Sequence, residues 1–250
     1  MREILYGRHA VYESLRAQRR TPYSLLLSEG IISLPIIDAI TALAQDAEVP
    51  IERISRDEMV RTVGNERHQG VALETSAYPY ADIGDMLALA DAQVEQPLLL
   101  LLDLIQDVRN LGSLIRTAEA AGVHGVVIQE RRAAGVTPAA VNTSSGAVEH
   151  LLVAQVTNLQ QEMVHLISAD LWMVGLADTA GARCYTEMDL TVPLGLVVGN
   201  EAEGLRRLVR ERCDWLIRIP MRGKIDSLNA AVAGSIGLYE VLRQRRQHGS

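Results

Sequence analysis

Apolar positions in the second part of the chain form continuous runs rather than an alternating pattern. The runs cover residues 98–105, 125–128, 151–156, 171–176, 194–198 and 216–220. Such runs are typical of strands that are covered on both faces. Helices are expected between several of these runs, because apolar residues have helical spacing at 110–121, around 205–209 and at 228–243. The first of these helices has Asn110 as a plausible N-cap and Gly122 as a C-terminal stop. The pattern predicts an α/β domain with a mostly parallel sheet and helices on both sides.

The first 75 residues have a shorter and more mixed pattern. A helix is expected around VYESLRAQ and at 35–47, with strands at 24–27, near Ile51 and at 70–73. This predicts a small α/β domain over residues 1–77. Apolar periodicity then weakens and Tyr78-Pro79-Tyr80 interrupts it, so we expect a linker at 78–96 and a second domain at 97–250.

Composition excludes several classes of protein. The chain has 250 residues, of which 48% are hydrophobic and 22% charged, as in globular proteins of one or two domains. The longest unbroken apolar run, 98–102, is far shorter than the roughly 20 residues of a membrane span, and the first residues contain no apolar signal segment. Cys184 and Cys213 form no CxxC pair, and the histidines lack metal-ligand spacing. We therefore expect a soluble, cytoplasmic protein without a disulfide, a metal site or a membrane partner.

The formal charge of −7 disfavours a general nucleic-acid binder. Only Lys224 among the 24 cations is lysine, and arginine suits bidentate phosphate contact, although a GC-rich genome gives the same bias. Three arginine clusters stand out: Arg16, Arg19 and Arg20; Arg206, Arg207, Arg210 and Arg212; Arg243, Arg245 and Arg246. Each cluster alone is explained by a solvated helix face.

Three expected strands end in polar, turn-rich segments, namely DVRNLGSLIRT, VVGNEAEGL and IPMRGKIDSLNA. Ligands of open α/β sheets bind beyond the carboxyl ends of the strands, so we interpret these segments as three walls of one site. The GxGxxG, P-loop and GxSxG signatures are absent; Ala233–Gly237 only approaches the last of them. Spacing alone therefore indicates an α/β enzyme and leaves its substrate open.

The residues of these segments resemble a known family. NLGSLIRTAEAAGV, LGLVVGNEAEGL and IPMRGKIDSLNAAVAGSIGLYEVLRQR are similar to the three motifs of the SpoU-type (TrmH-like) RNA 2′-O-ribose methyltransferases of the SPOUT superfamily. YGRHAV, HQGVAL and SSGAVEHLLVAQVTNL resemble bacterial members that modify a guanosine in the peptidyl-transferase region of 23S rRNA. The resemblance covers nearly the whole chain in the same order.

The resemblance implies an L30e-like RNA-binding domain, a catalytic domain with a deep trefoil knot, a homodimer whose sites use both subunits, and S-adenosylmethionine as methyl donor. The positions matching the cofactor-binding backbone are Gly199, Ile219 and Leu228. The positions matching the catalytic motif residues are Asn110, Arg116, Glu201, Ser227 and Asn229. We also expect Arg16, Arg19 and Arg20 to contact RNA.

Two of these roles have simpler alternatives. Arg116 alone would be interpreted as a solvent-facing helix residue, and Glu201 as a charge favoured at a helix N-terminus. A guanidinium stays charged, so Arg116 suits stabilisation of an oxyanion better than proton abstraction. The chain departs from its relatives at four positions, which bear on RNA affinity and target: Val108, Arg109, Asn142 and Ala231.

The leading hypothesis is thus methylation of a 23S rRNA guanosine, with no role for DNA. Two alternatives remain open. One is 2′-O-methylation of a tRNA or of another rRNA nucleotide. The other is a non-catalytic RNA-binding ribosome-assembly factor that has kept the fold.

Overall fold

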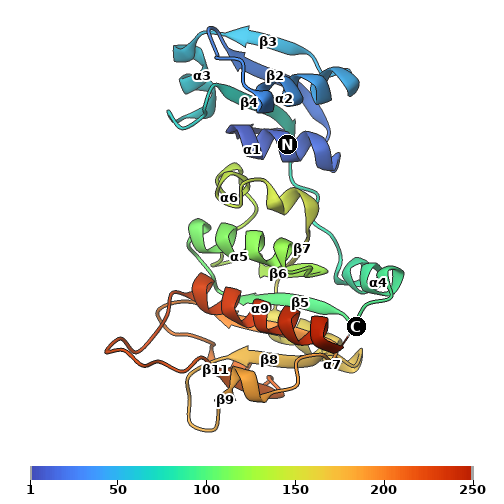
Figure 1. Cartoon of the computed structure of the whole chain (residues 1–250), viewed down its shortest axis with the longest axis vertical. Helices are drawn as coiled ribbons and strands as arrows, with labels where there is room; N and C mark the ends of the chain where they lie inside the picture. The colour runs from blue at the N-terminus through green and yellow to red at the C-terminus, as the bar shows by residue number, and fades with distance from the viewer. Residues whose placement is uncertain (1, 249–250) are drawn as a thin grey trace. The chain divides into compact units, whose positions relative to one another are not determined.

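The computed structural model describes residues 2–248, and the chain forms two compact units (Figure 1). Unit 1 comprises the N-terminal part up to Pro79 together with Val136–His150. Unit 2 comprises Tyr80–Gly135 and the chain from Leu151 onward. Each unit has its own sheet, in agreement with the expected combination of a small α/β domain and a parallel α/β domain.

Unit 1 is a four-stranded mixed sheet with helices. Its elements are β1 (Arg2–Tyr6), α1 (Arg8–Ala17), β2 (Pro22–Ser28), α2 (Pro35–Asp46), β3 (Ile51–Ile54), α3 (Arg56–Val63), β4 (Val71–Ser76), α6 (Pro138–Thr143) and η1 (Ala147–His150). The strand order is β1-β4-β2-β3, with β4 antiparallel to β1 and β2 and with β3 parallel to β2. The expected strands and helices are present, whereas β1 and α3 were not anticipated because each is short and has mixed polarity.

Val136–His150 packs with unit 1, although the sequence places it inside the second domain. Asn142 Nδ2 donates a hydrogen bond to the carbonyl of Tyr6 at 2.9 Å. Glu149 accepts a hydrogen bond from Arg20 Nε at 2.9 Å, and both side chains are fully buried. A division of the chain at one linker misses this segment, because tertiary contacts rather than chain order assign it to unit 1.

Unit 2 is built on seven parallel strands. Its elements are α4 (Ile83–Gln93), β5 (Leu98–Asp103), α5 (Val108–Ala120), β6 (Gly125–Gln129), β7 (Leu152–Val156), α7 (Leu159–Ser168), β8 (Trp172–Leu176), β9 (Arg183–Cys184), η2 (Tyr185–Glu187), β10 (Leu194–Gly199), α8 (Arg207–Arg210), β11 (Trp215–Arg218) and α9 (Ala230–His248). The order is β7-β6-β5-β10-β8-β11-β9, and all neighbouring pairs are parallel. All carboxyl ends therefore lie at the same edge of the sheet.

Helices cover both faces of this sheet, which explains the continuous apolar runs. On one face, α5 and α9 pack together; a Cβ on Gly234 of α9 would come within 3.2 Å of Val198 in β10. On the other face, α4, α7 and α8 contribute to a core that includes Met86, Met163 and Val209. The small residues of α9 thus allow close packing within unit 2.

Three boundaries differ from the expected ones. Helix α5 begins at Val108 with Asp107 as its N-cap, so Asn110 lies in the first turn instead of capping the helix. The expected linker at 78–96 contains the 11-residue helix α4, which begins with a capping box at Asp82. Helix α9 begins at Ala230 rather than at residue 228. Within residues 2–248, no helix has the length and apolar character needed to cross a membrane.

Candidate active site

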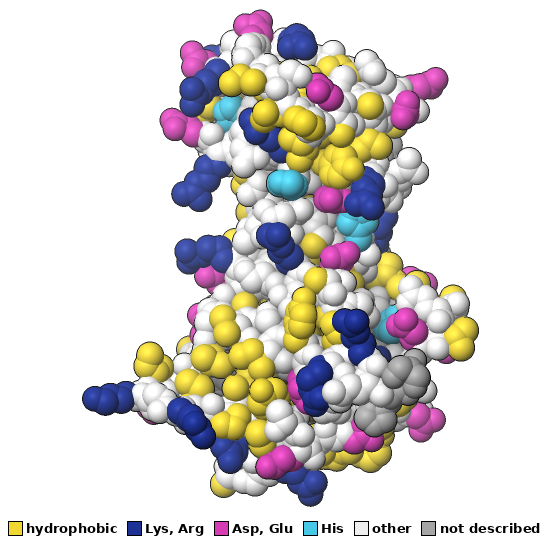
Figure 2. All heavy atoms as spheres, in the orientation of Figure 1, with side chains coloured by type: hydrophobic (Ala, Val, Ile, Leu, Met, Phe, Trp, Pro, Cys, Tyr) yellow, Lys and Arg dark blue, Asp and Glu magenta, His cyan; other side chains and the backbone are white. Residues whose placement is uncertain are grey.

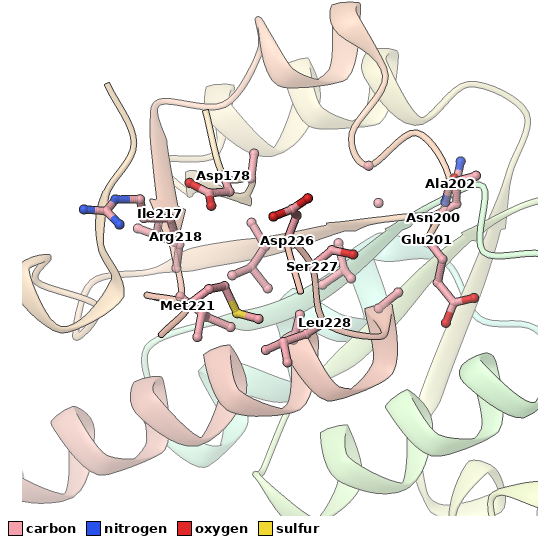
Figure 3. A pocket seen from close by; sticks show the side chains of 18 residues that line it. Asp178, Asn200, Glu201, Ala202, Ile217, Arg218, Met221, Asp226, Ser227 and Leu228 are labelled. Atoms are coloured by element: carbon pink, nitrogen blue, oxygen red, sulfur yellow. The ribbon is translucent and has the colours of Figure 1, made fainter. Parts of the chain in front are cut away.

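A pocket of about 360 Å³ opens at the carboxyl edge of the sheet in unit 2 (Figure 3). Its walls come from the ends of β8, β10 and β11 and from the start of α9. The lining includes Leu176, Asp178, Gly199, Asn200, Glu201, Gly204, Arg218, Ile219, Met221, Asp226, Ser227 and Leu228. The segments after β10 and β11 therefore form two walls of one pocket, as the sequence predicts.

Gly199 allows the chain to turn back on itself at the end of β10. A Cβ at this position would collide with the backbone carbonyl group of Gly204. Asn200 and Gly204 form an isolated bridge, and Gly204 has φ of 65°, in the left-handed region that glycine adopts readily. The resulting turn exposes backbone groups to the pocket, so Gly199 is needed for shape rather than for chemistry.

Side chains fix the loop that follows Gly199. Asn200 Oδ1 accepts hydrogen bonds from the backbone N–H groups of Ala202 and Glu203, at 3.0 and 2.9 Å. Asp103, which is buried at the end of β5, accepts a bond from the Arg206 backbone at 2.9 Å and one from its Nε at 2.8 Å. The loop is therefore held at both ends before any ligand binds.

Asn110, Glu201 and Asn229 meet beside the pocket and form an amide–carboxylate cluster. Asn110 Nδ2 donates to Glu201 Oε1 at 2.9 Å, and Asn229 Nδ2 donates both to Asn110 Oδ1 at 3.0 Å and to Glu201 Oε1. Asn229 Oδ1 accepts the N–H groups of Ala231 and Val232, which caps α9. One residue from each of the three motif segments thus contributes to this cluster.

The other expected site residues divide into two groups. Ser227, Ile219 and Leu228 line the pocket beside Gly199. Arg116 does not line it and lies on the exposed face of α5. The structure therefore brings together all the expected site residues of unit 2 except Arg116.

Several pocket residues were not singled out from the sequence, among them Asp178, Arg218, Met221 and Asp226. In Figure 3 the carboxylates of Asp178 and Asp226 point into the pocket, whereas the guanidinium of Arg218 points away from it. Asp178 comes two residues after the end of β8. The rule that ligands bind at carboxyl ends of parallel strands could have identified it, had the end of β8 been considered with the other three strand ends.

The expected RNA surface at Arg16, Arg19 and Arg20 needs correction. The side chain of Arg20 is fully buried and is bound by Glu3 at 2.7 Å and by Glu149, so it is not accessible to RNA. Arg19 donates to the hydroxyl of Tyr78 at 3.0 Å, and Arg16 is exposed beside Glu13. One member of this cluster of cations thus forms a buried ion pair, because Arg20 lies two residues before β2 and its side chain turns into unit 1.

Burial dominates the ionisation of this network. It raises the pKa of Tyr78 to about 12, although Arg19 opposes the rise. It also raises the pKa of Glu149, against the opposing effect of Arg20. The two arginines and their partners therefore form a structural network within unit 1, in which each arginine lowers the pKa of the buried acid beside it.

The pocket in unit 2 has the properties of a small-molecule site. Its volume lies at the lower end of the range for such sites. Three carboxylates line it, those of Asp178, Glu201 and Asp226, against the single cation Arg218. The lining thus favours a ligand that carries positive charge, and the turn at Gly199 gives its backbone close access to that ligand.

The whole chain matches a known family. Residues 97–239 match the SpoU rRNA Methylase family, and residues 4–81 match the RNA 2′-O ribose methyltransferase substrate binding domain. A putative TrmH family tRNA/rRNA methyltransferase of Bacillus subtilis is 40% identical over 99% of this chain and 98% of its own length.

Solved structures agree with this match. The SpoU methyltransferase AviRb from Streptomyces viridochromogenes, in complex with the cofactor AdoMet, has a TM-score of 0.82 at 26% identity and covers 98% of this chain and 91% of its own. An RNA 2′-O ribose methyltransferase has a TM-score of 0.77 at 26% identity, over 98% and 89%. With a pocket that suits a positively charged ligand at the strand ends, the chain belongs to the SpoU (TrmH) family and is an S-adenosylmethionine-dependent RNA methyltransferase.

Proposed function

We propose that the protein methylates the ribose 2′-hydroxyl of a guanosine in the peptidyl-transferase region of 23S rRNA, in the cytoplasm. The observation that carries this proposal is the amide–carboxylate cluster of Asn110, Glu201 and Asn229, because it joins the three motif segments at the edge of the cofactor pocket. The match of residues 4–81 to a substrate-binding domain of RNA 2′-O ribose methyltransferases supports the choice of ribose.

The chemical difficulty lies in the hydroxyl group. S-adenosylmethionine, when bound, supplies a methyl group that is already activated. The ribose hydroxyl is a weak acid, so the transition state needs stabilisation of negative charge on its oxygen. A guanidinium remains protonated at neutral pH, and Arg116 therefore holds the neighbouring phosphate and stabilises the developing oxyanion. The amide–carboxylate cluster fixes the loop after β10 and the start of α9, which together shape the cofactor pocket.

Arg116 reaches a site by association of two subunits. It lies on the exposed face of α5, outside the lining of the pocket in its own chain. The neighbouring helix α9 exposes Val232 and Tyr239, at 47% and 51%, and Figure 2 shows apolar side chains over this helix. We infer a homodimer through α5 and α9 in which each Arg116 serves the partner's site. The resemblance to SpoU-type methyltransferases supports a deep trefoil knot at the C-terminal end of the catalytic domain and an L30e-like fold for the N-terminal domain.

A tRNA is the second candidate substrate. The Bacillus subtilis relative is named a tRNA/rRNA methyltransferase, and this name leaves both classes of RNA open. Mapping of 2′-O-methyl groups in rRNA and tRNA from cells with and without the gene distinguishes them. We expect loss of one guanosine methyl group in the peptidyl-transferase region of 23S rRNA, with tRNA unchanged. Loss confined to a tRNA would transfer the proposal to that substrate.

Replacing Asp178 by asparagine should weaken binding of S-adenosylmethionine about fivefold, because one unit charge a few ångströms away in a hydrated pocket contributes about 1 kcal/mol. S-adenosylhomocysteine lacks the sulfonium charge, so its affinity should change by less than about twofold. Isothermal titration with both ligands measures the difference. Asp170→Asn, at the opposite end of β8, is the matched control. Equal losses for the two ligands would show that Asp178 does not act through charge.

A further inference from the structure

The last residue of β11 and the loop that follows it carry three cations within seven residues, Arg218, Arg222 and Lys224, the last being the only lysine of the chain. All three are exposed. Within residues 2–248 none of the three forms an ion pair. We call residues 218–225 the cationic loop. In the orientation of Figure 1, Figure 2 shows Lys and Arg side chains on the loop that projects beside β11 and α9.

Unlike several other cations of this protein, the three cations of the cationic loop have no carboxylate partner among the described residues. The net charge is −7, and several other arginines have a carboxylate partner within 4 Å. Examples are Arg2 with Glu74, Arg109 with Asp107, Arg206 with Asp103, Arg207 with Glu211, and Arg243 with Glu240. An acidic chain that binds RNA must do so through a local cationic surface, because its overall field repels a polyanion. The cationic loop provides such a surface.

The position of the loop connects it with the reaction. Arg218 and Met221 line the cofactor pocket, as do Asp226 and Ser227 immediately after the loop. The carboxylates of Asp178 and Asp226 face into the pocket, whereas the Arg218 guanidinium points out of it (Figure 3). Negative charge therefore faces the cationic methyl donor, and positive charge lies on the outer side of the same wall.

The loop also exposes a large apolar side chain. Ile225 is 72% exposed, beside Lys224 and one residue before Asp226. Apolar side chains of nucleic-acid-binding proteins, isoleucine among them, can insert between base steps, and a target nucleotide must leave its stack to enter an active site. An isolated exposed isoleucine needs no explanation by itself. Ile225, however, follows two unpaired cations and precedes a residue that lines the cofactor pocket. In this place it adds an apolar contact to a surface that otherwise binds through charge.

We propose that the cationic loop binds the phosphate backbone of the substrate RNA next to the target nucleotide, with Arg222 and Lys224 on phosphates and Ile225 against an adjacent base. This deepens the proposed function and rests on it, since it assigns the RNA contact that places the ribose beside the methyl donor. The loop is thus a positioning element, distinct from the residues that bind the cofactor.

The test is fluorescence anisotropy with a labelled RNA hairpin from the peptidyl-transferase region of 23S rRNA, over a series of salt concentrations. For Arg222→Ala/Lys224→Ala we expect affinity to fall about tenfold, and the slope of log affinity against log salt to decrease by about 1.4, or about 0.7 per phosphate contact. Ile225→Ser should weaken binding with the slope unchanged. S-adenosylmethionine affinity, measured by calorimetry, should stay within about twofold of the wild type.

The matched control is Arg207→Ala/Arg212→Ala, which removes the same charge around α8. It should leave both the affinity and the salt slope unchanged. An unchanged slope in the loop variant, equal losses in both double variants, or a comparable loss of cofactor affinity would overturn the proposal. Wild-type protein that binds and methylates the hairpin separates this outcome from failure of the proposed function, in which the wild type itself would not methylate the hairpin.

Discussion

Replacing Arg20 by alanine is expected to lower the free energy of unfolding of unit 1 by about 3–5 kcal/mol. The reason is burial. Arg20 and Glu149 have side chains that are fully inaccessible to solvent, and Arg20 donates to Glu149 at 2.9 Å. Without the guanidinium, the Glu149 carboxylate stays buried with its charge uncompensated. Hydrogen exchange of β1, β2 and β4, compared with that of the sheet in unit 2, measures the loss where it occurs.

Two variants separate the buried charge from other causes. Arg16→Ala removes an exposed arginine from the same part of the chain and should change stability by less than about 0.5 kcal/mol. Arg20→Ala/Glu149→Leu removes both charges and should regain much of the loss. If the double variant is as unstable as Arg20→Ala, packing of the arginine stem, and not the orphaned carboxylate, explains the effect.

The instability of Arg20→Ala should also depend on pH. Burial already raises the pKa of Glu149 above its ordinary value of 4.5, and Arg20 opposes the rise, so its removal raises the pKa further. A raised pKa in the folded state stabilises that state below the ordinary pKa, and the stabilisation is lost as pH rises through the folded value. The difference between variant and wild type should thus be small near pH 4.5 and largest at neutral pH.

Arg116→Ala should reduce the rate of methyl transfer by about 100-fold or more while the fold persists. Arginine and alanine have similar helix propensities, so the exposed position on α5 should cost less than about 1 kcal/mol of stability. Cofactor affinity should barely change, because Arg116 does not line the pocket. Arg116→Lys should recover little activity, since a point charge does not reproduce the planar guanidinium.

Single-turnover methylation beside thermal melting tests this prediction. Glu119→Ala is the control, because Glu119 is exposed near the other end of the same helix. It should leave the rate within about twofold. Mixed dimers of Arg116→Ala with a cofactor-site variant provide a second readout. If Arg116 serves the partner's site, such dimers should regain activity, whereas wild-type rates in Arg116→Ala itself would refute the catalytic role.

Much of unit 2 could be predicted from its sequence. Its buried strands, such as β5 and β10, are apolar on both faces, which predicts a parallel sheet covered by helices on both sides but not the order of its strands. The place of the pocket at the carboxyl edge of the sheet was also predicted, because the polar, turn-rich segments after β10 and β11 line it. These features depend on neighbours in sequence, or on the general geometry of α/β sheets.

Features that depend on distant contacts could not be predicted. Nothing in the sequence near Glu149 indicates that it pairs with Arg20, which lies 129 residues earlier. The assignment of Val136–His150 to unit 1 follows from that contact and from the bond between Asn142 and Tyr6. The exposure of Val232 and Tyr239 on α9, and that of the cations in the cationic loop, likewise could not be predicted, because it depends on which residues the rest of the fold covers.

The most direct test of the central claim is transfer of a labelled methyl group from S-adenosylmethionine to unmodified 23S rRNA by the purified protein. Digestion to nucleosides and mass spectrometry then identify the product. The account predicts 2′-O-methylguanosine from a single position in the peptidyl-transferase region, formed about 100-fold or more slowly by Arg116→Ala. Methyl label on a base instead of a ribose would contradict it. So would the absence of label from both 23S rRNA and added tRNA, if the protein binds the methyl donor normally.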